Sequence, residues 1–168
     1  MKTQTAFSLI ELMVALTLAA ILAMVALPSM GMILANNRIT TKSTDFVRAL
    51  NYTRGEAISN ATTMRLEPID ETGVWGNGWQ VINKNSTDDS VKAVVKFDDD
   101  ITIDMVKGPS SLSALQYDSR GRLTLSTWLT SITFWVCNKN YPQIDGREIT
   151  IRPIGTVSIK RCIKYPCT

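Results

Sequence analysis

The chain begins with a long run of apolar residues that contains one charged side chain. Glu11 stands near the head of this run, and residues 12–37 carry no charge before Arg38. Because about 20 apolar residues cross a bilayer as a helix, the run predicts a membrane-spanning segment. A carboxylate inside such a segment costs about 2.5–3.5 kcal/mol on insertion scales, so we expect Glu11 to have a partner. The pattern favours a subunit that exchanges lipid for protein neighbours.

The helical pattern continues beyond this run, with a single apolar face. Apolar residues recur three and four positions apart up to about Asn60, at Ile39, Phe46, Val47, Leu50, Ala57 and Ile58. A helix from Ser8 to Asn60 would be about 80 Å long at 1.5 Å per residue. Its first half suits lipid or neighbouring helices, and its second half has one face for a sheet.

The rest of the chain changes to short segments rich in β-branched and aromatic residues, separated by turn signals. We expect strands at residues 62–67, 78–84, 91–97, 101–106, 114–117, 121–126, 131–137, 147–152 and 156–162. This order predicts an α+β fold. In it a long N-terminal helix, transmembrane in its first half and amphipathic in its second, packs against an antiparallel β-sheet head.

The composition excludes catalysis that depends on histidine. The 168 residues are 45% apolar and 20% charged, with a net charge of +3, which fits one ordinary domain plus an anchor. The chain has no histidine, which excludes Ser-His-Asp and Cys-His catalysis and every His-ligated metal site. We therefore expect a protein that is not an enzyme and that has no cofactor and no metal site.

The three cysteines, Cys137, Cys162 and Cys167, are too few and too widely spaced for a zinc site. They fit one disulfide in an oxidising compartment with one thiol left over, and three reduced thiols are the alternative. If the last three strands form consecutive hairpins, Cys137 lies two strands from Cys162, beyond the roughly 7 Å limit unless the strand ends splay. We favour Cys137 bonded to Cys162 or Cys167, because a longer loop constrains the unfolded chain more.

Three interpretations of the first 35 residues compete. A cleavable secretory signal would have a shorter apolar core, and a plain membrane anchor leaves Glu11 unexplained. The third takes the leader, Phe7 and Glu11 together, because Phe7-Ser8-Leu9-Ile10-Glu11-Leu12 resembles the N-terminal signature of type IV pilins and type II secretion pseudopilins. The resemblance implies a leader of residues 1–6, cleavage between Ala6 and Phe7 by prepilin peptidase, and methylation of the new Phe7 amine. Ala6 departs from the glycine that is usual in the family.

The same resemblance divides the rest of the chain. Residues 7–35 would form a transmembrane and assembly helix with Pro28 as its helix break, and residues 36–168 a periplasmic or extracellular head that includes the second half of the helix. The Glu11 carboxylate would then attract the N-terminal ammonium of Phe7 in an adjacent subunit, inside a low-dielectric helix bundle. A surface carboxylate that reaches toward water is the simpler alternative.

The helix end and the head resemble a subgroup of this family. Tyr52-Thr53-Arg54-Gly55-Glu56-Ala57-Ile58 is similar to the helix-end motif of the FimT/GspH group of minor pilins, with Thr53 and Gly55 as departures. The segments Gly78-Trp79-Gln80-Val81 and Tyr117-Asp118-Ser119-Arg120-Gly121, and the hairpin from Cys137 to Gly155, follow the order of landmarks in that group.

This resemblance implies a minor pilin that starts as a single-pass precursor in the bacterial inner membrane, with its C-terminal part in the periplasm. It would then enter a type IV pilus at the cell surface, in the tip or initiation complex, and support pilus assembly, twitching and adhesion. The implied partners are other major and minor pilins, prepilin peptidase, the inner-membrane assembly platform and membrane lipid. A minor pseudopilin of type II secretion, which shares fold and processing, is the alternative.

A third alternative is a pilus-associated receptor that binds DNA for natural transformation. Basic residues gather near the C-terminus, and the candidates for phosphate contact are Arg152, Lys160, Arg161 and Lys164. Relatives that bind DNA have a Gly-Arg-x-Arg motif, whereas this chain has Gly155-Thr156-Val157-Ser158 at the matching position and lacks both arginines. We favour a solvated or subunit-facing basic patch over DNA binding.

Overall fold

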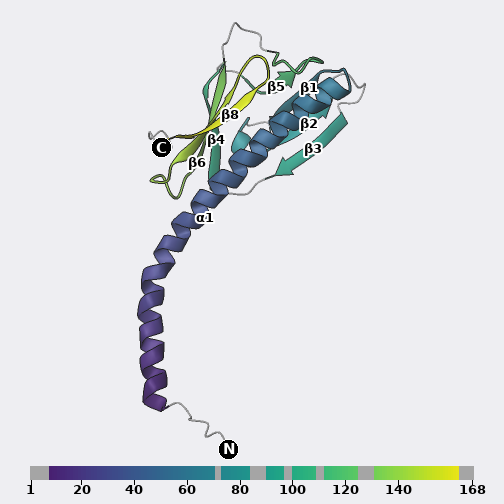
Figure 1. The fold of residues 1–168 in the computed structure, drawn as a ribbon. Helices are drawn as coiled ribbons and strands as arrows, with labels where there is room; N and C mark the ends of the chain where they lie inside the picture. Colours follow the sequence, from purple (N-terminus) through teal and green to yellow (C-terminus); the bar gives the residue numbers. More distant parts are fainter. Residues whose placement is uncertain are drawn as a thin grey trace, which may run out of the picture.

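The computed structural model describes residues 8–70, 73–83, 90–96, 100–108, 112–124 and 131–162. Its dominant element is one helix, α1 (Leu9–Ser59), which confirms the predicted long helix. Figure 1 shows the first half of α1 projecting away from the head and curving, while the second half lies against the strands. The helix is assigned as one element through position 28, but the Pro28 side chain lies outside the described residues, so its role as a helix break stays a prediction.

One face of the second half of α1 is completely buried. Ile39, Phe46, Leu50 and Ala57 have no exposed surface, and they recur at the spacing that brings residues onto one helix face. Ser43 and Thr53 lie on the same buried face, and their hydroxyls donate to the carbonyls of Ile39 and Ala49, four residues earlier in each case. These bonds let polar residues lie in the core without an unpaired hydroxyl group. Ile58 was also predicted on this face, but it is 49% exposed, so that assignment was wrong.

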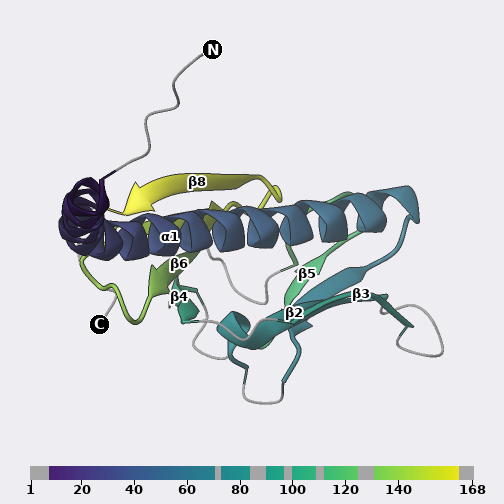
Figure 2. The same cartoon turned by 90° about the horizontal axis from the view of Figure 1, so that it is seen from below.

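The head contains two antiparallel sheets rather than the single sheet expected. The first has the strand order β3-β2-β1-β5, formed by β1 (Met64–Pro68), β2 (Gly78–Asn83), β3 (Ser90–Lys96) and β5 (Leu115–Tyr117). The second has the order β4-β6-β7-β8, formed by β4 (Ile101–Lys107), β6 (Ile132–Asn138), β7 (Gly146–Ile151) and β8 (Val157–Cys162). A short 3-10 helix, η1 (Trp75–Asn77), precedes β2. Figures 1 and 2 show α1 lying across both sheets.

The predicted strand at 121–126 is the one strand prediction that was wrong in its described part. Residues 121–124 form only an isolated bridge between Leu123 and Tyr117. The physical reason is the tight turn before it. The Asp118 N–H donates to the Arg122 carbonyl, and Gly121 adopts a left-handed φ of 72°. The turn reverses the chain, and only the short stretch up to Thr124, whose N–H donates to the Gln116 carbonyl, pairs back with β5 among the described residues.

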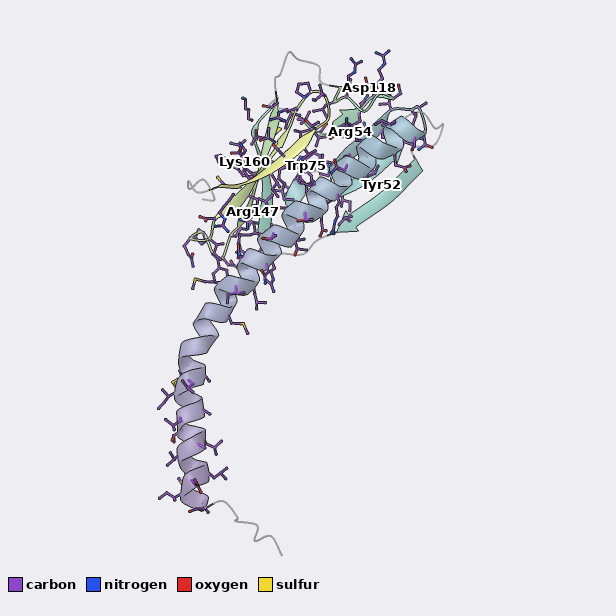
Figure 3. The ribbon with its side chains drawn as sticks, viewed as in Figure 1. Tyr52, Arg54, Trp75, Asp118, Arg147 and Lys160 are labelled. Carbon is purple, nitrogen blue, oxygen red and sulfur yellow. The ribbon has the colours of Figure 1, made fainter. Side chains whose placement is uncertain are left out.

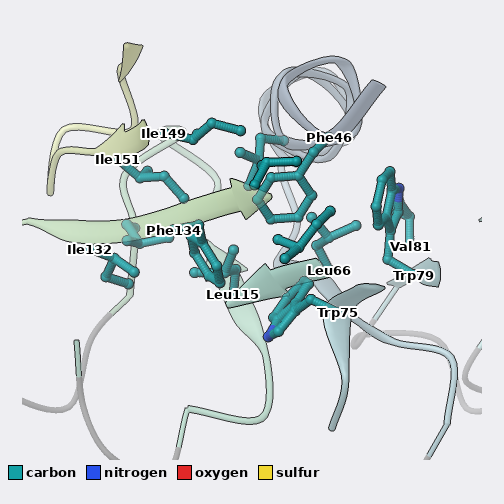
Figure 4. Packing of buried hydrophobic residues seen from close by; sticks show 14 of the residues in the cluster. Phe46, Leu66, Trp75, Trp79, Val81, Leu115, Ile132, Phe134, Ile149 and Ile151 are labelled. Atoms are coloured by element: carbon teal, nitrogen blue, oxygen red, sulfur yellow. The ribbon is translucent and has the colours of Figure 1, made fainter. Parts of the chain in front are cut away.

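Phe46 is the point where the helix and the two sheets share a core. Its ring meets the rings of Trp75, Trp79 and Phe134 edge to face, with centroid separations of 5.6, 5.1 and 5.2 Å. This arrangement of aromatic rings is the favoured one in protein cores. Figure 4 shows aliphatic side chains from both sheets around these rings, among them Leu66, Leu115, Ile149 and Ile151. The two sheets and the helix therefore fold as one unit.

Candidate functional site

The first half of α1 is an apolar surface that the head leaves uncovered. Its large side chains are mostly more than half exposed: Leu9, Ile10, Leu12, Met13, Val14, Leu16, Leu18, Ile21, Leu22, Met24, Met30, Ile33 and Leu34. Monomeric soluble proteins rarely leave a continuous apolar patch of more than a few hundred Å² in water. This half of the helix is therefore built to be covered. Within the described part of the chain, no helix has the length and mean hydropathy that a membrane span requires.

Glu11 lies in the first turn of this apolar half. The Ser8 backbone N–H donates to Glu11 Oε2 at 3.4 Å, so the carboxylate points back toward the start of the helix. A negative charge is favourable there, because the free N–H groups of the first turn carry partial positive charge. The predicted cleavage residues, Ala6 and Phe7, lie outside the described residues. The geometry therefore places the acid close to where the processed chain would begin.

The boundary between the bare and covered halves of the helix lies near Ala35. Ala35 is the first buried residue of α1 among those described, at 3% exposed. One turn earlier, the loop between β6 and β7 reaches the helix, since a Cβ added to Gly31 would lie 2.8 Å from the Tyr141 hydroxyl oxygen. Glycine at position 31 allows this close approach. The sequence predicts no contact between Tyr141 and the helix, because only the folded loop brings the two together.

At the opposite end of the head, the arginine of the helix-end motif joins three segments. Arg54 Nε donates to the Gly121 carbonyl at 2.9 Å, and Arg54 Nη2 donates to the Ile154 carbonyl at 3.3 Å. The helix end is thus bound to the turn after β5 and to the turn between β7 and β8. We call Arg54, Gly121 and Gly155 the arginine clamp. Figure 3 shows Arg54 and Asp118 at this end of the head and Arg147 at the other.

The two glycines of the clamp have no room for a side chain. Both adopt a left-handed conformation, with φ of 72° at Gly121 and 82° at Gly155. A Cβ on Gly155 would overlap the Gly121 carbonyl oxygen and lie 2.8 Å from Arg54 Nε. Glycine is typical of turns in a sequence, but nothing in the sequence indicates that these two turns meet at Arg54.

Asp118 fixes the turn that presents Gly121 to the clamp. Its Oδ1 accepts the backbone N–H groups of Arg120 and Arg122 at 3.0 and 2.8 Å, and its Oδ2 accepts Arg122 Nε at 3.1 Å. Desolvation alone would raise the pKa of Asp118, but these donors together lower it below its ordinary value. Burial raises the pKa of the neighbouring Tyr117, against the opposing effect of the Arg54 charge.

The structure does not bring the predicted DNA-contact residues together. Lys160 and Arg161 are consecutive in β8, so their side chains point to opposite faces of the sheet. Arg152 is exposed in the β7–β8 turn at the clamp end, and Lys164 lies outside the described residues. Among the described residues these cations form no continuous stripe, so the geometry adds no support for the DNA interpretation.

Arg161 instead lies opposite Arg147, another basic residue of the C-terminal region, in the pairing of β7 with β8. Arg147 Nη2 donates to Thr40 Oγ1 at 3.1 Å and to Asn36 Oδ1 at 3.4 Å, which ties β7 to the helix. Desolvation and the Arg161 charge lower the pKa of Arg147, and Asp145 acts in the opposite direction.

Cys137 and Cys162 lie at one end of the second sheet but on strands separated by β7. Val136 faces Arg147, and Gly146 faces Cys162, which confirms the consecutive hairpins. With strands about 4.8 Å apart, two cysteines separated by one strand have Cα atoms about 10 Å apart, whereas a disulfide requires less than about 7 Å. The register therefore disfavours a Cys137–Cys162 bond. Cys167 lies outside the described residues.

Comparison with known proteins agrees with this architecture. The family model described as type II transport protein GspH matches residues 42–155, and the prokaryotic N-terminal methylation motif matches residues 1–27. The sequence finds no match among curated proteins.

Two solved structures have the same fold. The type IV minor pilin FimU of Pseudomonas aeruginosa is 20% identical with a TM-score of 0.57, over 77% of this chain and 93% of the FimU chain. The minor pseudopilin EpsH from the type 2 secretion system of Vibrio cholerae is 15% identical with a TM-score of 0.52, over 73% of this chain and 95% of the EpsH chain. The GspH model and the methylation motif together span most of the sequence. The chain therefore belongs to the type II transport protein GspH family, and it is a structural subunit of the pilin and pseudopilin kind rather than an enzyme.

Proposed function

We propose that the protein is a minor pilin that is incorporated in a type IV pilus through the first half of α1. The observation that carries this proposal is the bare apolar half-helix with a single acid, Glu11, in its first turn. Residues 1–6 act as the leader, residues 7–35 as the membrane and assembly helix, and residues 36–168 as the head.

The apolar half of α1 is covered by lipid before assembly and by other subunits after it. In the precursor it spans the inner membrane once, with the head in the periplasm, and lipid covers its apolar side chains. Prepilin peptidase then removes the leader between Ala6 and Phe7, and the new Phe7 amine is methylated. The assembly platform transfers the subunit into the filament, where the helices of other major and minor pilins replace lipid.

Glu11 directs this last step. Cleavage creates a positive charge at Phe7, four residues before Glu11 in the sequence, and Glu11 lies in the first turn of the helix. Inside a bundle of apolar helices, a lone charge is strongly unfavourable, so an incoming Glu11 is stabilised next to the Phe7 ammonium of a neighbouring subunit. The ion pair fixes the axial position of each helix relative to its neighbour in the filament.

Replacing Glu11 with leucine should leave leader removal intact and reduce the amount of this protein in sheared filaments at least tenfold. N-terminal mass spectrometry checks processing, and an immunoblot of filaments checks incorporation. Glu11→Gln, which keeps the size but removes the charge, should behave like Glu11→Leu. Normal incorporation of both variants would contradict the proposed charge pairing.

A deletion strain separates the pilus from the alternative of a type II secretion pseudopilus. We expect loss of surface pili, twitching and adhesion, with normal secretion of exoproteins. Loss of secretion with intact pili would assign the protein to the secretion system instead. A position in the tip or initiation complex predicts that few copies per filament suffice, which immunogold labelling of pilus ends would check.

We also propose a disulfide between Cys137 and Cys167 in the oxidising periplasm. The register of β6, β7 and β8 disfavours Cys162 as the partner, and Cys137 is buried at the end of β6. Peptide mapping without reductant should recover a linked pair containing Cys137 and Cys167. A linked pair containing Cys162 and Cys167, or three unlinked peptides, would contradict this assignment.

A further inference from the structure

The end of the head nearest the bare half-helix carries basic residues, and of these only Arg147 holds the head to the helix. Four basic residues lie there: Arg38 on α1, Lys139 after β6, Arg147 on β7 and Arg161 on β8. We call these four residues the cationic base. Carboxylates also lie near this end: Asp145 in the β6–β7 loop, Asp100 before β4, and Glu148, which follows Arg147 on β7 and faces Lys160. Figure 3 shows Arg147 at this end of the head, beside the helix.

Within the cationic base, Arg147 and Arg161 hold two like charges close together. Arg147 and Arg161 are directly opposite in the pairing of β7 with β8, an arrangement that is unfavourable between strands. Asp145 compensates only in part, since its nearest oxygen is 3.9 Å from Arg161 Nε. Arg147 is held in place by Thr40 and Asn36, while Arg38, Lys139 and Arg161 are exposed. Such a cluster is stabilised when anions lie next to it.

The cationic base lies just beyond the end of the apolar run of α1, and this position indicates which anions it binds. The apolar run ends at Ala35, and Asn36, Asn37 and Arg38 follow it at once. If residues 7–35 lie in a bilayer, the cationic base lies at the level of the lipid headgroups. Basic residues at that level are attracted by anionic lipid.

The β6–β7 loop provides a second, independent indication. Asn138 Oδ1 accepts the backbone N–H groups of Asn140 and Tyr141 at 2.9 and 3.1 Å, so the loop has a defined conformation. The loop holds the Tyr141 hydroxyl beside Gly31, within the last turn of the apolar run. Tyrosine is enriched at this depth, where its ring meets acyl chains and its hydroxyl meets headgroups.

We infer that the cationic base and Tyr141 form a docking surface for anionic phospholipid headgroups, on which the head rests before assembly. The inference depends on the membrane stage of the proposed function. Entry into the filament then requires the head to leave this surface, so the lipid composition sets how readily the precursor is released to the assembly platform.

The test uses the full-length chain in lipid nanodiscs of two compositions, pure phosphatidylcholine and phosphatidylcholine with 30% (about one third) phosphatidylglycerol. Hydrogen exchange of residues 139–147 should be at least about threefold slower in the anionic discs. In 1 M salt the difference should disappear, because the Debye length falls to about 3 Å and the charges of the lipid are then screened. The double variant Arg38→Gln/Arg161→Gln should exchange equally in both discs. The matched control, Arg120→Gln/Arg152→Gln, removes two exposed cations from the far end of the head and should keep the difference.

Equal exchange of the unaltered protein in the two discs would overturn the inference while leaving the membrane stage intact. The same holds if the far-end control loses the difference, because the effect would then come from overall charge. Failure of the chain to enter either disc would overturn the membrane stage itself, and the inference with it. Arg147 is left unchanged, since its bonds to the helix make its replacement a test of folding.

Discussion

Replacing Phe46 with alanine should lower the free energy of unfolding of the head by about 3–5 kcal/mol. The Phe46 side chain has no exposed surface, and it is in contact with aromatic rings from η1, β2 and β6. Alanine would leave a cavity where the helix and both sheets meet. Few neighbours can collapse into it, because rigid rings line it on three sides.

Urea denaturation in detergent, followed by tryptophan fluorescence, measures this loss. Trp75 and Trp79 touch Phe46, so the signal comes from the site of the change. Arg48→Ala is the matched control two residues along the same helix, because its side chain is 75% exposed and its ion pair with Asp45 should contribute less than about 1 kcal/mol. A loss below 1 kcal/mol for Phe46→Ala would show that the three elements do not share this core.

The second large effect is expected at the arginine clamp, where Gly155→Ala should cost roughly 2–4 kcal/mol. Two separate penalties combine. The left-handed φ of 82° is unfavourable for alanine, and the new Cβ would overlap the Gly121 carbonyl oxygen that Arg54 binds. The β7–β8 turn would have to move away from the helix end. The midpoint of thermal unfolding should fall by roughly 2–4 °C for each kcal/mol lost.

Gly73 separates these two penalties, and Gly55 gives a prediction of the opposite sign. Gly73 has a similar φ of 74° with no atom within 4 Å of a Cβ, so Gly73→Ala reports the backbone penalty alone. Gly55 is exposed in α1 with equally open surroundings, so Gly55→Ala should raise stability by about 0.5–1 kcal/mol. Equal losses at Gly155 and Gly73 would mean that the contact with Gly121 contributes nothing.

The elements of the fold could be predicted from local patterns in the sequence. The three- and four-residue spacing from Ile39 to Ala57 predicted α1, and β-branched segments predicted the strands, because each signal is contained within its own segment. The Phe7-to-Leu12 segment predicted the N-terminal methylation motif for the same reason. The wrong strand at 121–126 also had a local cause, since its residues suit a strand but Asp118 and Gly121 form a turn instead.

Contacts between distant segments could not be predicted in this way. Arg54 and Ile154 are 100 residues apart in the chain, and nothing in either neighbourhood indicates the other. The division of the strands into two sheets depends likewise on which strand edges meet. The separation of Lys160 from Arg161 could have been foreseen from strand alternation alone. The position of Tyr141 beside Gly31 could not, because it depends on the path of a loop.

The first half of α1 is exposed, whereas its second half is packed against both sheets of the head. This arrangement determines how the head would respond to a pulling force. In a filament under tension, force would enter the head through the first half of α1 and pull along the helix axis. The helix would then be kept from sliding past the sheets by its buried side chains Phe46, Leu50 and Ala57. The hydrogen bond from Arg54 to the Gly121 carbonyl would oppose the same movement at the far end. A force along the helix axis is shared by all these contacts, so they must break together rather than one after another. If the subunit is incorporated in a filament as proposed, its head would withstand pulling along the helix axis better than peeling away from the helix.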